Sequence, residues 1–186
     1  MKQSFLITLL LLALTATACG DPDLSYDDPQ TKAEASRYVD ELMLSFREGT
    51  LSGYLCPDVQ WAHISALLEY GKSTEIVGDG AHAIPANPIS SYLMTQCSEG
   101  MFALWMVEAA RIHTLNPSAK GIGGWPSQNA FVQRLNENGI FPNWYINDPA
   151  VQQEVLTAYV SWWKAANGKK SAASVDPLAG TGYAWH

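Results

Sequence analysis

Residues 97–112 read CSEGMFALWMVEAARI, and we expect this stretch to form the centre of the fold. Its apolar part is hydrophobic on nearly every side of a helix and carries two charges, Glu108 and Arg111. A helix that is apolar all round is normally buried, so we expect the rest of the chain to pack around this one. At about 15 residues with two charges, it is too short and too polar to span a bilayer.

The first 18 residues predict a secretory signal. Lys2 precedes the apolar run FLITLLLLAL at residues 5–14, which is too short for a permanent membrane anchor, and small residues follow it. The next residue is Cys19, and residues 16–19, ATAC, resemble the lipobox of bacterial lipoproteins. That resemblance implies that Cys19 becomes the first mature residue and carries acyl chains such as palmitate. The alternative is an ordinary secreted protein cleaved after Ala18.

Residues 19–30 predict a disordered acidic tether, because they are rich in aspartate and lack apolar periodicity. Acidic residues behind a lipidated cysteine resemble the export signal of surface lipoproteins in Bacteroidota. A solvated linker without a sorting role is the alternative. We therefore expect a bacterial cell-envelope protein, held on the outer membrane by its N-terminal lipid, with display on the cell surface as the further expectation.

Composition indicates one globular domain, which we place at residues 31–186. Of the 186 residues, 47% are hydrophobic, enough for a sizeable core. The formal net charge of −7 disfavours nucleic acid as a partner, because binding phosphates requires a basic surface. The four histidines, His63, His82, His113 and His186, lack the short spacing of metal ligands, so neither a metal nor another cofactor is predicted.

Two cysteines, Cys56 and Cys97, remain in the mature chain after Cys19. An even pair in an exported protein predicts a disulfide between them. The alternative is two separate buried thiols that pack as small apolar residues.

Helical periodicity and capping residues predict an all-α domain of about five helices around the central one, with long ordered loops and a docked, irregular C-terminal tail. Besides the central helix, the predicted helices are 31–48, with a capping box at Thr31 and Glu34, 58–70, 126–138 and 149–167. Residues 74–77 could form one extended segment, but the sequence shows no strand to pair with it. Gly100 indicates that another backbone passes close to the central helix.

Glu108 and Arg111 share one face of the central helix and can pair. One interpretation is an internal ion pair that also fixes loop backbone. The other is a polar pocket in which Glu108 acts as an acid or base, together with a histidine from a loop, in an envelope hydrolase. No hydrolase motif supports the second interpretation. Trp125 and Trp144 lie in predicted loops and are candidate ligand contacts, with burial in the core as the alternative for each.

Several segments together resemble a family of small, mostly helical, uncharacterised lipoproteins of Bacteroidota. They are the lipobox, HISALLEY, NPISSY, ALWMVEAARI and DPLAGTGYAW. The resemblance implies membrane anchoring and supplies no catalytic residue. We therefore expect a lipid-anchored binding or protein-interaction domain rather than an enzyme, with an envelope glycan or an envelope protein as its partner.

Overall fold

The computed structural model describes residues 28–51, 55–78, 96–119, 124–134 and 143–186. The α-helices within these ranges are α1 (Pro29–Arg47), α2 (Ile64–Tyr70), α3 (Glu99–Leu115) and α4 (Pro149–Ala166). The strands are β1 (Ile76–Val77), β2 (Cys97–Ser98), β3 (Val132–Arg134), β4 (Asn143–Tyr145) and β5 (Tyr183–Trp185). Short 3-10 helices are η1 (Trp61–His63), η2 (Pro117–Ala119) and η3 (Lys170–Ser174). The predicted all-α fold is wrong, because the described part of the chain combines helices with two small antiparallel sheets.

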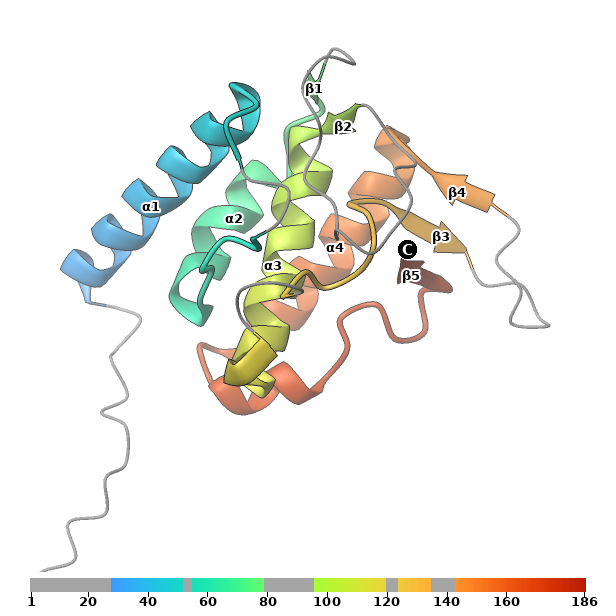
Figure 1. Ribbon diagram of the computed structural model, residues 1–186. Coiled ribbons are helices and arrows are strands. Elements are labelled where there is room, and N and C mark those ends of the chain that lie inside the picture. Colours follow the sequence, from blue (N-terminus) through green and yellow to red (C-terminus); the bar gives the residue numbers. More distant parts are fainter. Residues whose placement is uncertain (1–27, 52–54, 79–95, 120–123, 135–142) are drawn as a thin grey trace, which may run out of the picture.

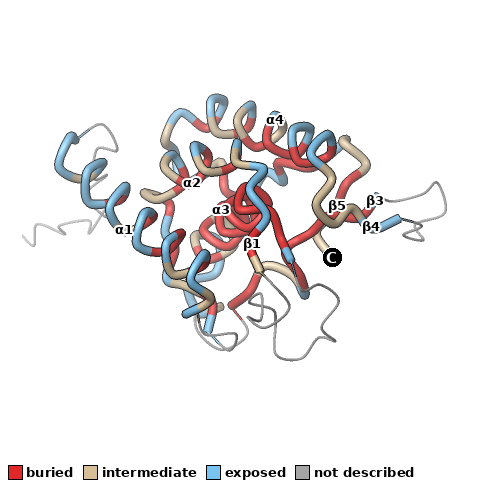
Figure 2. Tube along the Cα trace, turned by 90° about the horizontal axis from the view of Figure 1, so that it is seen from above, coloured by how far each residue is buried: buried red, intermediate tan, exposed pale blue. Residues whose placement is uncertain are grey.

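The central helix is α3, as the apolar sequence predicts. Every residue from Met101 to Ala110 is buried. Figure 1 shows α1 and α2 on one side of α3, and α4 with the three-stranded sheet on the other. Seen from above in Figure 2, α3 is buried at the centre of the molecule. Phe46 of α1 stacks on Phe102 with ring centroids 3.9 Å apart, so α1 is fixed to α3 by an aromatic contact.

The start of α3 differs from the predicted one. Its N-cap is Ser98, whose side-chain oxygen accepts a hydrogen bond from the backbone of Met101. Cys97 and Ser98 instead form strand β2, which pairs with β1. The extended segment that had no evident partner in the sequence therefore pairs with the residues directly before the central helix.

Gly100 marks a close approach of backbone, and this prediction is confirmed. A Cβ atom at this position would lie 2.5 Å from the carbonyl oxygen of Ser73 and 2.6 Å from that of Gly71. The Gly100 backbone N–H donates to the Ser73 oxygen at 3.0 Å. Glycine is required here because a side chain would force apart α3 and the segment that follows α2.

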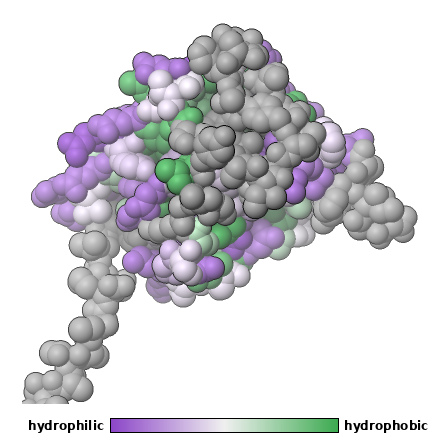
Figure 3. All heavy atoms as spheres, in the orientation of Figure 1, coloured by the Kyte–Doolittle hydropathy of each residue, from purple (hydrophilic) through white to green (hydrophobic). Residues whose placement is uncertain are grey.

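The first helix begins earlier than predicted. Asp28 is the N-cap of α1, with Pro29 at the first helical position, and the Asp28 carboxylate accepts hydrogen bonds from the backbone and hydroxyl of Thr31. The end of the predicted tether is therefore helical, and Thr31 is not a cap. The exposed side of α1 is mostly hydrophilic (Figure 3). Residues 1–27, which include the predicted signal and Cys19, lie outside the described residues.

The second predicted helix is shorter than expected and forms in two parts. A 3-10 turn, η1, leads directly into α2, and the N-cap of that turn is Gln60 rather than Asp58. The buried residues of α2 are Ile64, Leu67 and Leu68, which are the apolar positions of this segment.

The helix predicted at 126–138 is absent from its described part, which contains strand β3. In the sheet, β3 lies between β4 and β5 and is antiparallel to both. Buried Val132 pairs with Tyr145 and Trp185, and Gln133 pairs with Trp144 and Ala184. These long-range pairs outweigh the local helical pattern, which is why the sequence alone misleads here.

The last helix is confirmed. Asp148 caps α4, Pro149 occupies its first position, and Asn167 ends it in a left-handed conformation. The tail after α4 docks onto the body as expected, but it is not irregular, because it contains η3 and β5. Among the described residues, no helix combines the length and hydropathy that crossing a membrane requires.

Candidate functional site

One side of the three-stranded sheet carries aromatic and uncharged polar side chains. Because side chains alternate along a strand, it presents Phe131, Gln133, Trp144, Ala184 and His186, and we call this set the outer face. The opposite side faces α4, since Tyr183 contacts Glu154 and Trp185 contacts Tyr159. The sheet therefore separates a side joined to α4 from a side that bears Trp144.

The aromatic rings of the outer face contact one another. Phe131 is fully buried and stacks on His186 with centroids 4.7 Å apart. Trp144 lies 5.9 Å from the Phe131 ring and 5.3 Å from the His186 ring, and the side chain remains 51% exposed. The indole is thus held against its neighbours while much of its surface stays in contact with solvent.

Gln133 stands directly opposite Trp144 in the pairing of β3 with β4. Its residue is only 7% exposed, and its side-chain amide makes no hydrogen bond with any residue in the described ranges. The fully buried side-chain atom that lacks a hydrogen-bond partner among the described residues is Nε1 of Trp125, not an atom of Gln133. The Gln133 amide is therefore a polar group beside Trp144 and not an unsatisfied buried one.

His186 is oriented by backbone and side-chain contacts. Its carbonyl oxygen accepts hydrogen bonds from the backbone N–H groups of Gln128 and Asn129, and its own N–H donates to Phe131. The Asn129 amide nitrogen lies 3.1 Å from Nδ1 of His186. Burial lowers the pKa of His186, so the neutral ring accepts at Nδ1 and carries its proton on Nε2. No described residue hydrogen-bonds Nε2, which leaves it as a donor.

The second polar cluster surrounds Glu108 on α3. The Arg111 guanidinium contacts both oxygens of this carboxylate, at 2.6 and 2.9 Å, and donates to the Ala173 carbonyl at 2.7 Å. The Tyr159 hydroxyl donates to Glu108 at 2.7 Å and accepts from the Trp185 indole N–H at 2.8 Å. We call Glu108, Arg111, Tyr159 and Trp185 the carboxylate network.

The carboxylate network is buried and internally satisfied. Glu108 is 6% exposed. Burial and the neighbouring Glu108 charge raise the pKa of Tyr159 well above its usual range, so its hydroxyl stays protonated. Burial lowers the pKa of Arg111 and the Glu108 carboxylate raises it, with a net rise. The arrangement is that of an internal ion pair, which ties the C-terminal tail to α3 through Ala173 and Trp185.

A hydrolytic role for Glu108 requires a histidine within hydrogen-bond reach. His113 is buried, and its Nε2 lies 2.8 Å from the Gly124 carbonyl. His63 accepts from the Gln60 backbone and stacks on Tyr38. His186 lies on the outer face, and His82 falls outside the described residues. Among the histidines that the structure describes, none contacts Glu108.

Comparison with known proteins defines the family. Residues 30–186 match the family described as a domain of unknown function, DUF4943. The chain belongs to the DUF4943 family. Neither the search of curated proteins nor that of solved structures gave a match. The family match covers the described part of the chain almost completely. The family is of unknown function, so the match does not assign an activity.

The two tryptophans singled out in the sequence differ sharply in this DUF4943 domain. Trp144 is exposed on the outer face, whereas Trp125 is only 5% exposed and stacks on Trp105 with ring centroids 4.7 Å apart. Trp105 in turn donates to the Ser127 hydroxyl. Trp125 therefore belongs to the core around α3, and Trp144 is the stronger candidate for ligand contact.

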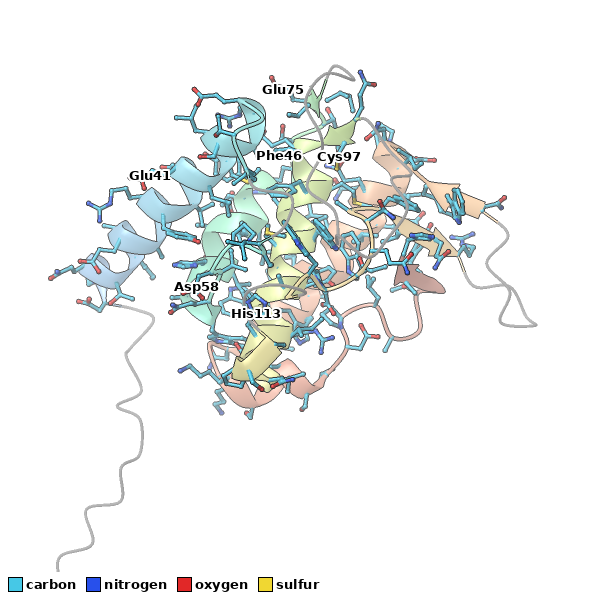
Figure 4. All side chains as sticks on the ribbon, in the orientation of Figure 1. Glu41, Phe46, Asp58, Glu75, Cys97 and His113 are labelled. Carbon is cyan, nitrogen blue, oxygen red and sulfur yellow. The ribbon has the colours of Figure 1, made fainter. Side chains whose placement is uncertain are left out.

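The predicted disulfide is absent, because Cys56 and Cys97 are both free, buried thiols. Cys97 lies within hydrogen-bond distance of its own neighbour's carbonyl and that of Ala130. Burial raises the pKa of both thiols, that of Cys56 to about 12 with a further contribution from Asp58. Figure 4 shows Cys97 near the amino end of α3 and His113 near its other end. Each cysteine packs as a small apolar residue.

Sequence reasoning missed Glu99, Gln133 and the role of His186. Glu99 is buried at the start of α3, where its carboxylate pairs with Arg47 of α1 at 2.6 Å. A charge at the first position of an apolar helix was the available signal for Glu99. Gln133 and His186 join the site only through strand pairing, for which the local sequence holds no signal.

Proposed function

We propose that this DUF4943 protein is a lipid-anchored binding domain of the bacterial cell envelope. It uses the outer face of its three-stranded sheet to hold an envelope component. A lipid on Cys19 attaches it to the outer membrane, with the domain directed toward the cell surface in the manner of Bacteroidota lipoproteins. The protein carries out no reaction of its own in this account.

The binding role is supported by a contrast between the polar groups of the carboxylate network and those of the outer face. The acidic, basic and phenolic groups of the carboxylate network are bound to one another, so they have no capacity left for a substrate. The outer face instead combines a half-exposed indole with an amide and an imidazole N–H that lack partners among the described residues. Apolar surface with a few convergent polar groups is typical of a ligand site.

The proposed anchor rests on the lipobox-like residues 16–19 and on the short segment that separates Cys19 from the first helix. The predicted tether covers residues 19–30, and α1 begins at Pro29 within it. Acyl chains contribute about 0.8 kcal/mol per buried CH₂ group, so two or more of them hold a protein on a membrane durably. Metabolic labelling with an alkyne-bearing fatty acid tests this part: the full chain becomes labelled, and Cys19→Ser abolishes the label. Labelling that persists in Cys19→Ser excludes Cys19 as the lipidated residue.

Site-specific photo-cross-linking in intact cells tests the binding role. The full chain receives a photoreactive benzoylphenylalanine in place of Trp144, or in place of Val175 as the matched control. Val175 is a comparably exposed apolar residue that directly follows η3 and is not part of the three-stranded sheet. We expect a cross-linked product of higher mass from position 144 and none from position 175. Equal products at both positions, or none at position 144, would contradict the proposed function.

A further inference from the structure

The outer face has the chemistry of a small, specific site rather than of a general adhesive patch. Its members come from three neighbouring strands or their ends: Gln133 from β3, Trp144 from β4 and His186 directly after β5. Strand pairing fixes their relative positions, so the site needs little ordering when a ligand arrives.

The exposed indole selects for a ligand with a flat apolar side. Trp144 is braced by Phe131 and His186 and presents its free surface to solvent. An aromatic ring in this setting gains most from stacking against a rigid ring of similar size. A pyranose ring offers such a side, because its axial C–H bonds gather on one face while its hydroxyl groups lie around the rim.

The polar groups select for hydroxyl or acetamido groups. The Gln133 amide can donate and accept, and neutral His186 donates from Nε2. Sugar hydroxyls do both, so they can satisfy this pair. Among the described residues, the fully buried side-chain atom without a hydrogen-bond partner is Nε1 of Trp125, so Gln133 contributes to the site through its position directly opposite Trp144.

The charge of the site indicates a neutral ligand. No side chain of the outer face is charged, since burial lowers the pKa of His186 and its ring is neutral. The described ion pair of Arg134 with Glu154 lies on the opposite side of the sheet. An anionic sugar or a phosphate would therefore meet no compensating cation among the described side chains of this face.

We infer that the outer face of this domain binds a neutral sugar ring, which stacks on Trp144 and hydrogen-bonds to Gln133 and to Nε2 of His186. The inference rests on the proposed binding function and specifies its ligand class. It makes the protein a receptor for neutral glycan chains of the cell surface or of the surroundings.

A glycan array tests the ligand class. The full chain, purified in mild detergent, is applied to printed neutral hexose and N-acetylhexosamine oligosaccharides. Uronic-acid and sialylated oligosaccharides and a proline-rich peptide serve as comparisons. We expect binding to a subset of the neutral oligosaccharides only. Binding restricted to the peptide or to the charged glycans overturns the inference, as does an array without binding.

Variants then locate the site with the best-bound oligosaccharide, by calorimetric titration. Loss of the stacking ring in Trp144→Ala lowers the affinity at least about 10-fold, and Gln133→Met lowers it by a similar factor through loss of one or two hydrogen bonds. Trp144→Phe retains part of the affinity, and Val175→Ala retains all of it. Because Gln133 is buried, near-ultraviolet circular dichroism first shows that each variant is folded. Wild-type affinity in folded Trp144→Ala overturns the inference.

The two proposals fail separately. If position 144 cross-links in cells but no neutral glycan binds, the outer face is a binding surface for another class of molecule, and only the sugar inference is lost. If position 144 does not cross-link and no glycan binds, both are lost.

Discussion

The carboxylate network and the outer face lie on opposite sides of one small sheet and use their polar groups in opposite ways. In the network, Glu108, Arg111 and Tyr159 bind one another and the C-terminal tail. On the outer face, Gln133 and His186 leave an amide and an N–H without a partner among the described residues. Polar groups that are satisfied internally stabilise the fold, whereas groups left unsatisfied beside an exposed ring are available to a ligand.

The difference also explains why charge alone is a poor guide to function in this protein. Glu108 and Arg111 are the most conspicuous residues of the central helix, yet their burial and bidentate contact give them a structural role. Trp144 and Gln133 are uncharged, and the site they form depends on an exposed ring and on the strand register that sets the two residues opposite each other.

The largest effect is expected from Arg111→Ala. The substitution leaves the Glu108 carboxylate buried without its counter-charge and releases Ala173, so the free energy of unfolding falls by about 3–5 kcal/mol. Urea denaturation of the full chain in detergent measures it. The double variant Glu108→Gln with Arg111→Met removes both charges, so its free energy of unfolding should fall clearly less than that of Arg111→Ala. An equal loss in both variants would show that the ion pair itself does not explain the effect.

Tyr159→Phe removes one hydroxyl and should cost about 1–2 kcal/mol of unfolding free energy, because Glu108 loses a donor and the Trp185 indole loses its acceptor. The same denaturation experiment measures the change. Tyr145→Phe is the matched control, since this partly buried tyrosine lies on the same side of the sheet outside the network. A Tyr159→Phe variant as stable as wild type would contradict the network as a stabilising unit.

Trp144→Ala should destabilise the fold much less than Arg111→Ala in the carboxylate network. Because the indole contacts the Phe131 and His186 rings but remains 51% exposed, the free energy of unfolding should fall by only about 1 kcal/mol. Thermal unfolding followed by circular dichroism measures it, with core residue Trp105→Ala as the strongly destabilised comparison. A loss as large as that of Trp105→Ala would show that Trp144 is structural.

The smallest effect is a pH dependence from His186. Burial lowers its pKa below the ordinary 6.5, so its contribution to stability is fully present above pH 6.5 and is lost as the pH falls through the folded-state pKa. Protonated Nδ1 would then face the Asn129 amide N–H instead of accepting from it. His186→Gln should flatten the slope of stability between pH 7 and pH 5. An unchanged slope would contradict a neutral, Nδ1-accepting ring.

The three long helices, α1, α3 and α4, could be predicted because their signals are local. The uniform apolar character of residues 97–112 identifies α3, and Asp148 with Pro149 identifies the start of α4. The strands could not, because β3, β4 and β5 are three residues each and owe their form to pairing between distant segments. The same holds for the site: Trp144 was named from its type, but only strand register brings Gln133 and His186 beside it. The disulfide prediction failed because an even cysteine count says nothing about the distance between two thiols.

The most direct test of the account is the affinity of two variants for one ligand. Wild type, Glu108→Gln and Trp144→Ala are titrated side by side with the oligosaccharide that binds the wild-type chain best, under conditions in which all three are folded. The account predicts that Glu108→Gln binds as wild type, because its side chain belongs to the internal network, and that Trp144→Ala loses at least about 10-fold in affinity. Wild-type affinity in Trp144→Ala together with lost binding in Glu108→Gln would contradict it and place the site at the carboxylate network.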